Sequence, residues 1–118
     1  MANEFGEYVR DKRERLRKTD PAFSIRRLAD RINLEPSYLS KIERGLEAPP
    51  SCKKIVLLAE ELGEDSDVML ALAGKVSADL LEVIRRRPAL FGIILRELRD
   101  LSDYAILRLV SEARDGKW

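Results

Sequence analysis

Residues 24–45 (SIRRLADRINLEPSYLSKIERG) constrain the fold of this chain more than any other stretch, because they predict two short helices joined by a tight corner. Ser24 is expected to cap the first helix, since its hydroxyl can accept a hydrogen bond from a free backbone N–H of the first turn. Asn33 tolerates a left-handed backbone and is expected to form the corner. Four apolar residues at helical spacing predict the buried face of the first helix: Ile25, Leu28, Ala29 and Ile32.

The second helix of this stretch is expected to begin at Pro36 and to stop at Gly45. Proline is well placed at the first position of a helix, where its missing N–H has no partner to lose, and glycine favours the position just past the end. Leu39 and Ile42 are expected to face the core. The outward face is expected to carry small polar, aromatic and basic side chains: Ser37, Tyr38, Ser40, Lys41 and Arg44. A short helix with such a face fits the major groove of DNA, which admits one α-helix.

The stretch and its flanks resemble the helix-turn-helix of the lambda-repressor-like (XRE-type) DNA-binding domains. Periodicity alone would fit an ordinary helical hairpin equally well, and it is the whole set of short motifs that favours DNA binding. The resemblance covers about residues 4–72 and implies an all-α, five-helix DNA-binding domain. The matching residues are Ser24, Leu28-Ala29, the SYLSKIERG run from Ser37 to Gly45, Pro50-Ser51, Leu58-Ala59 and Leu62-Gly63.

Candidate DNA contacts follow from the resemblance and from side-chain chemistry. Ser37 and Lys41 are the candidates for base edges, since lysine can donate to guanine O6 and N7 and serine can bond to several bases. Tyr38 is a candidate for a thymine-methyl contact or for a phosphate contact. Residues expected to contact phosphates, and so to position the protein on the duplex, are Ser24, Arg26, Arg27, Arg44, Ser51 and Lys53.

One structural pair is also implied by the resemblance. Arg13, on a first helix expected over residues 3–18, matches the family arginine that pairs with the glutamate matching Glu43. Such a partly buried pair would lock the first helix to the DNA-reading helix. The alternative is that Arg13 is an ordinary exposed arginine in a densely charged segment.

The chain departs from the family pattern in two places. The family often has a glutamine after the cap that bridges a DNA phosphate, whereas this chain has Ile25, so that contact is absent or is replaced by Arg26 or Arg27. The turn at residues 19–23 is longer than the usual link, and Phe23 is expected to fill the core where the family carries a leucine. The longer loop either adds contacts to the DNA backbone or has no role.

Charge is distributed unevenly along the chain. The full sequence has 22 Lys and Arg against 21 Asp and Glu, a net charge of +1. Residues 1–54 hold 13 basic and 9 acidic residues, a net +4, and residues 55–118 hold 9 and 12, a net −3. The basic half contains the predicted helix-turn-helix, as a phosphate-contacting surface requires, although a bias of this size also occurs as ordinary surface variation.

Several classes of chemistry are disfavoured by composition. The 118 residues include no histidine and one cysteine, which argues against histidine-based catalysis, the usual zinc sites and an internal disulfide. No glycine-rich phosphate loop is present, so we expect no enzyme, no cofactor and no metal. The N-terminus lacks the apolar core of a signal peptide, which predicts a cytoplasmic protein. Cys52, in the first turn of a helix expected over 52–63, is either a redox switch or an idle thiol.

Residues beyond the resemblance predict three further short helices with a surplus of aliphatic side chains. We therefore expect two domains, residues 1–74 as the DNA-binding domain and residues 75–118 as a helical extension that mediates self-association. The alternative is that the extension simply packs on the helices before it. Arg85-Arg86-Arg87 is better explained as a helix terminus than as a DNA contact. The expected centre of the dimer contact is formed by Phe91, Ile94, Leu95 and Leu98.

The function predicted from the sequence is a DNA-binding transcription regulator, a repressor rather than an activator, that binds double-stranded DNA as a homodimer. A twofold dimer predicts a near-palindromic operator with half-sites about one helical turn, ~34 Å, apart. One alternative is an antitoxin or phage-type repressor whose C-terminal module binds a second protein. Another is a protein–protein adaptor that has lost DNA binding.

Overall fold

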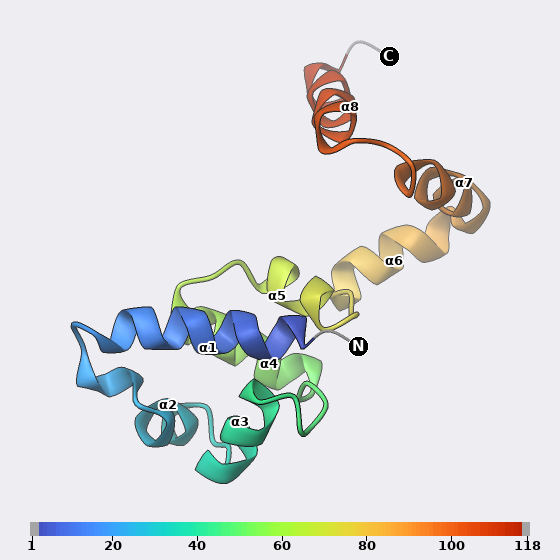
Figure 1. Cartoon of the computed structure of the whole chain (residues 1–118). Helices are drawn as coiled ribbons and strands as arrows, with labels where there is room; N and C mark the ends of the chain where they lie inside the picture. The colour runs from blue at the N-terminus through green and yellow to red at the C-terminus, as the bar shows by residue number, and fades with distance from the viewer. Residues whose placement is uncertain (1–2, 117–118) are drawn as a thin grey trace. The chain divides into compact units, whose positions relative to one another are not determined.

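The computed structural model describes residues 3–116, and within that range the chain is helical with no strand (Figure 1). The chain divides into two compact units, residues 1–77 and 78–118. The predicted all-α class is confirmed. The helices of the first unit are α1 (Glu4–Arg17), the 3₁₀ helix η1 (Pro21–Phe23), α2 (Ile25–Arg31), α3 (Pro36–Glu43), α4 (Cys52–Leu62) and α5 (Ser66–Leu72). Those of the second unit are α6 (Ala78–Arg86), α7 (Pro88–Leu98) and α8 (Asp103–Asp115).

The corner between α2 and α3 forms as its local signals predict. The Ser24 hydroxyl accepts a hydrogen bond from the Arg27 backbone N–H at 3.3 Å and caps α2. Asn33 has a φ of 57°, and the next residue, Leu34, donates its N–H back to the Ala29 carbonyl at 2.9 Å. This left-handed turn ends α2 and redirects the chain into α3.

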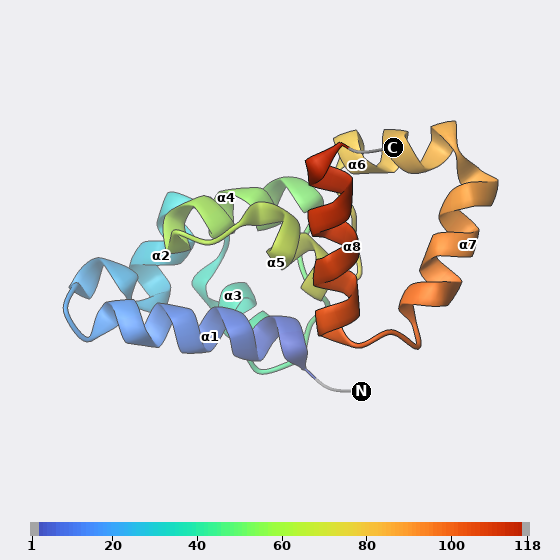
Figure 2. The same ribbon diagram turned by 90° about the horizontal axis from the view of Figure 1, so that it is seen from above.

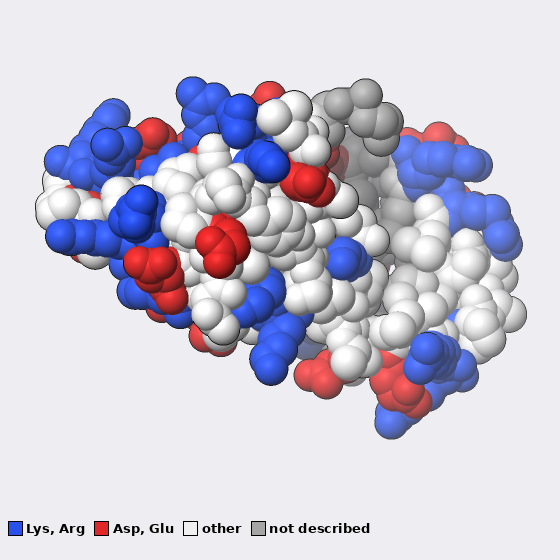
Figure 3. Space-filling model, turned by 90° about the horizontal axis from the view of Figure 1, so that it is seen from below, with Lys and Arg blue, Asp and Glu red and all other residues white. Residues whose placement is uncertain are grey.

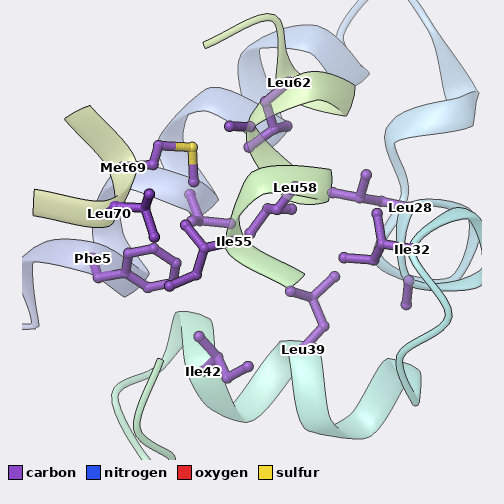
Figure 4. Packing of buried hydrophobic residues seen from close by; sticks show 13 residues of the cluster. Phe5, Leu28, Ile32, Leu39, Ile42, Ile55, Leu58, Leu62, Met69 and Leu70 are labelled. Carbon is purple, nitrogen blue, oxygen red and sulfur yellow. The ribbon is translucent and has the colours of Figure 1, made fainter. Parts of the chain in front are cut away.

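The core of the first unit is apolar and draws on all five α-helices. Ile55 and Leu58 of α4 lie at its centre, between side chains of α2 and α3 on one side and of α1 and α5 on the other (Figure 4). Each fully buried leucine or isoleucine contributes about 1.5–3 kcal/mol to folding. The buried side chains are Phe5, Val9, Leu28, Ala29, Ile32, Leu39, Ile42, Ile55, Leu58, Ala59, Leu62, Met69 and Leu70.

Helices α4 and α5 begin and end at strong local signals. Ser51 caps α4 by accepting a hydrogen bond from the Lys54 N–H at 3.3 Å, and Gly63 ends it with a φ of 69°. Asp65 caps α5 through its carboxylate, which accepts hydrogen bonds from the N–H groups of Asp67 and Val68. α1 packs against α3, α4 and α5. Together with α1, helices α4 and α5 cover the inner side of the helix-turn-helix (Figure 2).

The second unit is built differently, because none of the residues described in α6, α7 and α8 is buried. Its helices are well defined locally: α7 has Pro88 at its first position, and Ser102 caps α8 by accepting a hydrogen bond from the Ala105 N–H at 3.2 Å. Large apolar side chains are exposed along all three helices, including Val83, Leu90, Ile93, Leu95, Tyr104 and Leu107. Within the described residues, the second unit therefore has well-defined helix starts but no buried core.

Candidate nucleic-acid interface

The outward face of α3 is the centre of the candidate interface. Ser37, Lys41 and Arg44 are exposed. Leu39 and Ile42, on the opposite face, are buried. Within residues 3–116, Lys41 has no ion pair or hydrogen bond to another side chain. A rigid helix thus presents a free ammonium group and a small hydroxyl, the donor types that read base edges in the major groove.

Tyr38 differs from the sequence-based expectation. It was expected to face outward, but it is half-buried and packs against the core cluster. Ser40, also expected outward, is half-buried. An aromatic ring with one polar end is often placed this way, because its apolar body gains from burial. Only part of the Tyr38 side chain is therefore accessible to a ligand.

Arg13 and Glu43 form a buried bidentate ion pair. Arg13 Nε donates to Glu43 Oε2 at 2.7 Å and Nη2 donates to Oε1 at 2.9 Å, and the two residues are only 3% and 4% exposed. Burial alone would lower the pKa of Arg13, but the hydrogen bond and the charge of Glu43, together with the smaller effect of Glu14, outweigh it and raise that pKa above its ordinary value. The paired charges and parallel hydrogen bonds fix the orientation of α3 against α1.

A second contact joins the start of α1 to the end of α3. The Asn3 side-chain amide donates to the Glu43 carbonyl at 2.9 Å. Gly6, inside α1, lies so close to the Ile42 carbonyl that a Cβ at this position would overlap it. The local sequence does not predict the hydrogen bond from Asn3 to Glu43, and the glycine inside a predicted helix is the one signal for the close approach of α1 and α3.

Two basic residues of the net-positive part of the sequence, Lys54 and Arg31, join separate segments of the first unit. Lys54 Nζ donates to the carbonyls of Ile32 at 2.8 Å and Asn33 at 3.2 Å, which satisfies free carbonyls at the end of α2. Arg31 Nε donates to Glu61 Oε1 at 2.7 Å, and its guanidinium carbon lies 5.0 Å from the centre of the Phe23 ring. Neither contact is visible in the local sequence, because each joins segments far apart in the chain.

The residues expected to contact phosphates fall into two groups. Ser24 and Ser51 use their hydroxyls as acceptors for the caps of α2 and α4. The basic ones are exposed: Arg44 donates to the Ser40 carbonyl at 3.4 Å, and in the described part of the chain no acidic side chain pairs with Arg26, Arg27 or Lys53. Figure 3 shows the face on which α2 and α3 lie, with Lys and Arg side chains along its edges.

The residues expected to mediate dimerisation all lie on α7. Ile94 and Leu95 are 49% and 53% exposed, and Phe91 and Leu98 are half-buried. A helix with this much exposed aliphatic surface has room for a partner.

The described residues form neither a metal-binding cluster nor a membrane-spanning helix. Residues 3–116 contain no group of three or more His, Cys, Asp or Glu side chains placed to hold a metal ion. Over the same range no helix has the length and apolarity needed to cross a bilayer.

Comparison with known proteins decides the family. A family model described as Helix-turn-helix (HTH_3) matches residues 10–69, just over half of the 118 residues. The chain belongs to the helix-turn-helix family of the lambda-repressor-like (XRE) type. Membership confirms the predicted family and identifies a DNA-binding transcription regulator.

Two further comparisons add less. A solved structure named SinR protein/SinI protein complex matches this helix-turn-helix chain at 18% identity, over 96% of this chain and 97% of that chain, with a TM-score of 0.49. A comparison with curated proteins finds no matching sequence.

Proposed function

We propose that this helix-turn-helix protein is a sequence-specific repressor that acts in the cytoplasm and binds a near-palindromic operator as a homodimer. The observation that carries the proposal is α3 itself, whose exposed Ser37 and Lys41 are presented by a helix that a buried ion pair fixes in place. A fixed helix can hold donors at defined positions in the groove, which direct readout of bases requires.

In this proposal the contacts divide by role. Ser37 and Lys41 read base edges, and the accessible part of Tyr38 contacts a thymine methyl or a phosphate. A second set positions the protein on the phosphate backbone without reading sequence: Ser24, Arg26, Arg27, Arg44, Ser51 and Lys53. The exposure of the four basic residues in this set supports that role.

The homodimer is supported by the second unit. Helices α6–α8 have no buried residue within the described range, although they carry many aliphatic side chains. A second copy packed through Phe91, Ile94, Leu95 and Leu98 would cover part of this surface. Two copies would then present two α3 helices to half-sites about one helical turn, ~34 Å, apart.

The same exposed surface favours one second candidate. An antitoxin or phage-type repressor would use α6–α8 to bind a different protein, and this surface would serve that partner as well. An adaptor without DNA binding has weaker support, because it rests only on Ile25 at the usual glutamine position and on the longer link before α2.

Selection of bound sequences from a random duplex pool, at two salt concentrations, tests the proposal. An enriched near-palindrome that persists at the higher salt is expected. Binding that enriches no sequence and collapses as salt rises would reduce the interaction to phosphate attraction, and the repressor proposal would be abandoned.

A further inference from the structure

One short segment of the first unit carries a net positive charge on exposed side chains. Residues 1–77 hold 14 basic and 14 acidic residues and are neutral overall. Residues 1–16 are balanced, with 4 of each, and residues 28–77 are acidic, with 6 basic against 9 acidic. Residues 17–27, from the end of α1 to the first turn of α2, hold 4 basic residues and 1 acidic residue, a net +3. Residues 17–27 can therefore attract a polyanion, although the first unit as a whole is neutral.

Most of the basic side chains of this segment have no acidic partner in the described residues. All four are exposed, and in the described part of the chain only Arg17 has an acidic neighbour, an exposed contact of 3.3 Å to Glu14. Exposed pairs of this kind contribute about 0–1 kcal/mol and are easily exchanged for another anion. The one carboxylate in the segment belongs to Asp20, which accepts a hydrogen bond from the Ala22 N–H at 2.9 Å.

The structure places the end of α1 beside the start of α2. Arg17 follows Arg13 by four residues, so the two share a face of α1. Arg13 Nη1 donates to the Phe23 carbonyl at 3.2 Å, directly before the Ser24 cap of α2. The Arg17 side of α1 therefore lies next to η1 and the first turn of α2. Figure 3 shows Lys and Arg side chains gathered at this end of the face.

Arg15 lies on a different side of the same helix. Lys12, three residues earlier, contacts Glu64 at 3.0 Å, and the Arg15 charge helps to lower the pKa of Glu64 after the hydrogen bond from Lys12. Arg15 therefore faces the α4–α5 connection rather than α2, and it supplies a matched control.

We infer that Arg17, Lys18, Arg26 and Arg27, here called the α1–α2 patch, bind phosphates of duplex DNA next to the half-site that α3 reads. The inference rests on the proposed DNA binding and extends it to Arg17 and Lys18, which lie outside the helix-turn-helix. Each phosphate contact releases about 0.9 of a condensed counterion on B-DNA, so the patch adds to the salt-dependent affinity of a domain whose residues outside 17–27 carry a net −3.

The test compares Arg17→Gln/Lys18→Gln with the control Arg15→Gln/Arg114→Gln, which removes the same charge elsewhere. Dissociation constants are measured across a salt series on the duplex enriched by selection, or on random duplex if none is enriched. Loss of two phosphate contacts makes the slope of log affinity against log salt less steep by about 1.8. Between about 50 and 200 mM salt, the affinity of the patch variant should therefore fall about tenfold less than that of the wild type. The control keeps the wild-type slope, and base preference is unchanged in both.

Two outcomes overturn the inference in distinguishable ways. If the patch variant has the same salt slope as the control while the wild-type protein still selects its operator, the role assigned to the patch is wrong and the DNA-binding proposal stands. A wild-type protein that binds neither duplex removes the DNA-binding proposal and the patch with it.

Discussion

Arg13 and Glu43 illustrate what single residues contribute to this site. Replacement of Arg13 by leucine would leave the Glu43 carboxylate buried without its partner. We expect the free energy of unfolding to fall by about 3–5 kcal/mol, because the stranded charge is not compensated. Urea unfolding of Arg13→Leu at neutral pH measures this directly.

The control for this prediction is Arg17→Leu on the same helix, whose exposed pair with Glu14 is worth at most about 1 kcal/mol. The double variant Arg13→Leu/Glu43→Leu should recover part of the stability, since it removes both charges together. Equal unfolding midpoints for Arg13→Leu and Arg17→Leu would show that the buried pair does not anchor α3.

At this scale the sequence predicts contacts that are local and misses those that are not. The Ser24 cap and the left-handed Asn33 follow from chemistry within four residues of chain, and both are confirmed. The roles of Arg31 and Lys54 depend on carbonyls and carboxylates brought close only by folding. The partial burial of Tyr38 was mispredicted for the same reason, since helical spacing alone does not show how far neighbouring helices cover an edge residue.

At the scale of elements, α1 is joined to the α4–α5 connection by the Lys12–Glu64 ion pair. The hydrogen bond from Lys12 holds the pKa of Glu64 below its ordinary value of 4.5. A carboxyl group whose pKa is lower in the folded state than in the unfolded state stabilises the fold at pH values above its unfolded pKa. This contribution is lost as the pH falls through the folded pKa. We expect Glu64→Gln to be less stable than the wild type at neutral pH, with the difference shrinking as the pH falls below about 4.5.

Thermal unfolding of both proteins across that pH range measures the difference. Glu60→Gln, an exposed carboxyl of α4 without an ion pair in the described residues, is the matched control and should show no such convergence. A gap between Glu64→Gln and the wild type that stays constant into acid would contradict the assigned role of the pair.

Element boundaries were largely predictable because caps and breakers mark them. The first helix was expected over residues 3–18 and is observed as Glu4–Arg17, and α3 begins at Pro36 as expected. The link expected as a simple turn at 19–23 contains a short 3₁₀ helix, η1, which its Asp20 cap and Pro21 start favour. Short 3₁₀ segments are difficult to predict because they lack a repeating apolar pattern.

At the scale of the whole molecule, the second unit decides the oligomeric state in our proposal. Leu95→Arg places a charge on an exposed apolar position of α7, where a partner copy would have to bury it. We expect this variant to be monomeric at micromolar concentration, with the first unit still folded. Sedimentation measures the mass, and circular dichroism reports whether the helices of the first unit persist.

Leu46→Arg is the matched control, because Leu46 is 64% exposed and lies in the first unit after α3. It should sediment as the wild type does. An unchanged dimer in Leu95→Arg would remove the assignment of α7 as the dimer contact. The sequence predicts the surplus apolar surface of this unit, but the identity of the partner that covers it depends on a second surface, which a single chain does not contain.

The measurement that most directly tests the central claim, that α3 reads an operator in a twofold complex, is a parallel selection of bound duplexes by the wild type and by Lys41→Ala. Lys41 is exposed on α3 and free of ion pairs within residues 3–116, so its removal should leave the fold intact. We predict that the variant loses about 1–3 kcal/mol of discrimination at one base pair, and at the symmetric base pair of the other half-site, while preferences elsewhere persist. A Lys41→Ala selection with the same base preferences as the wild type would contradict the claim.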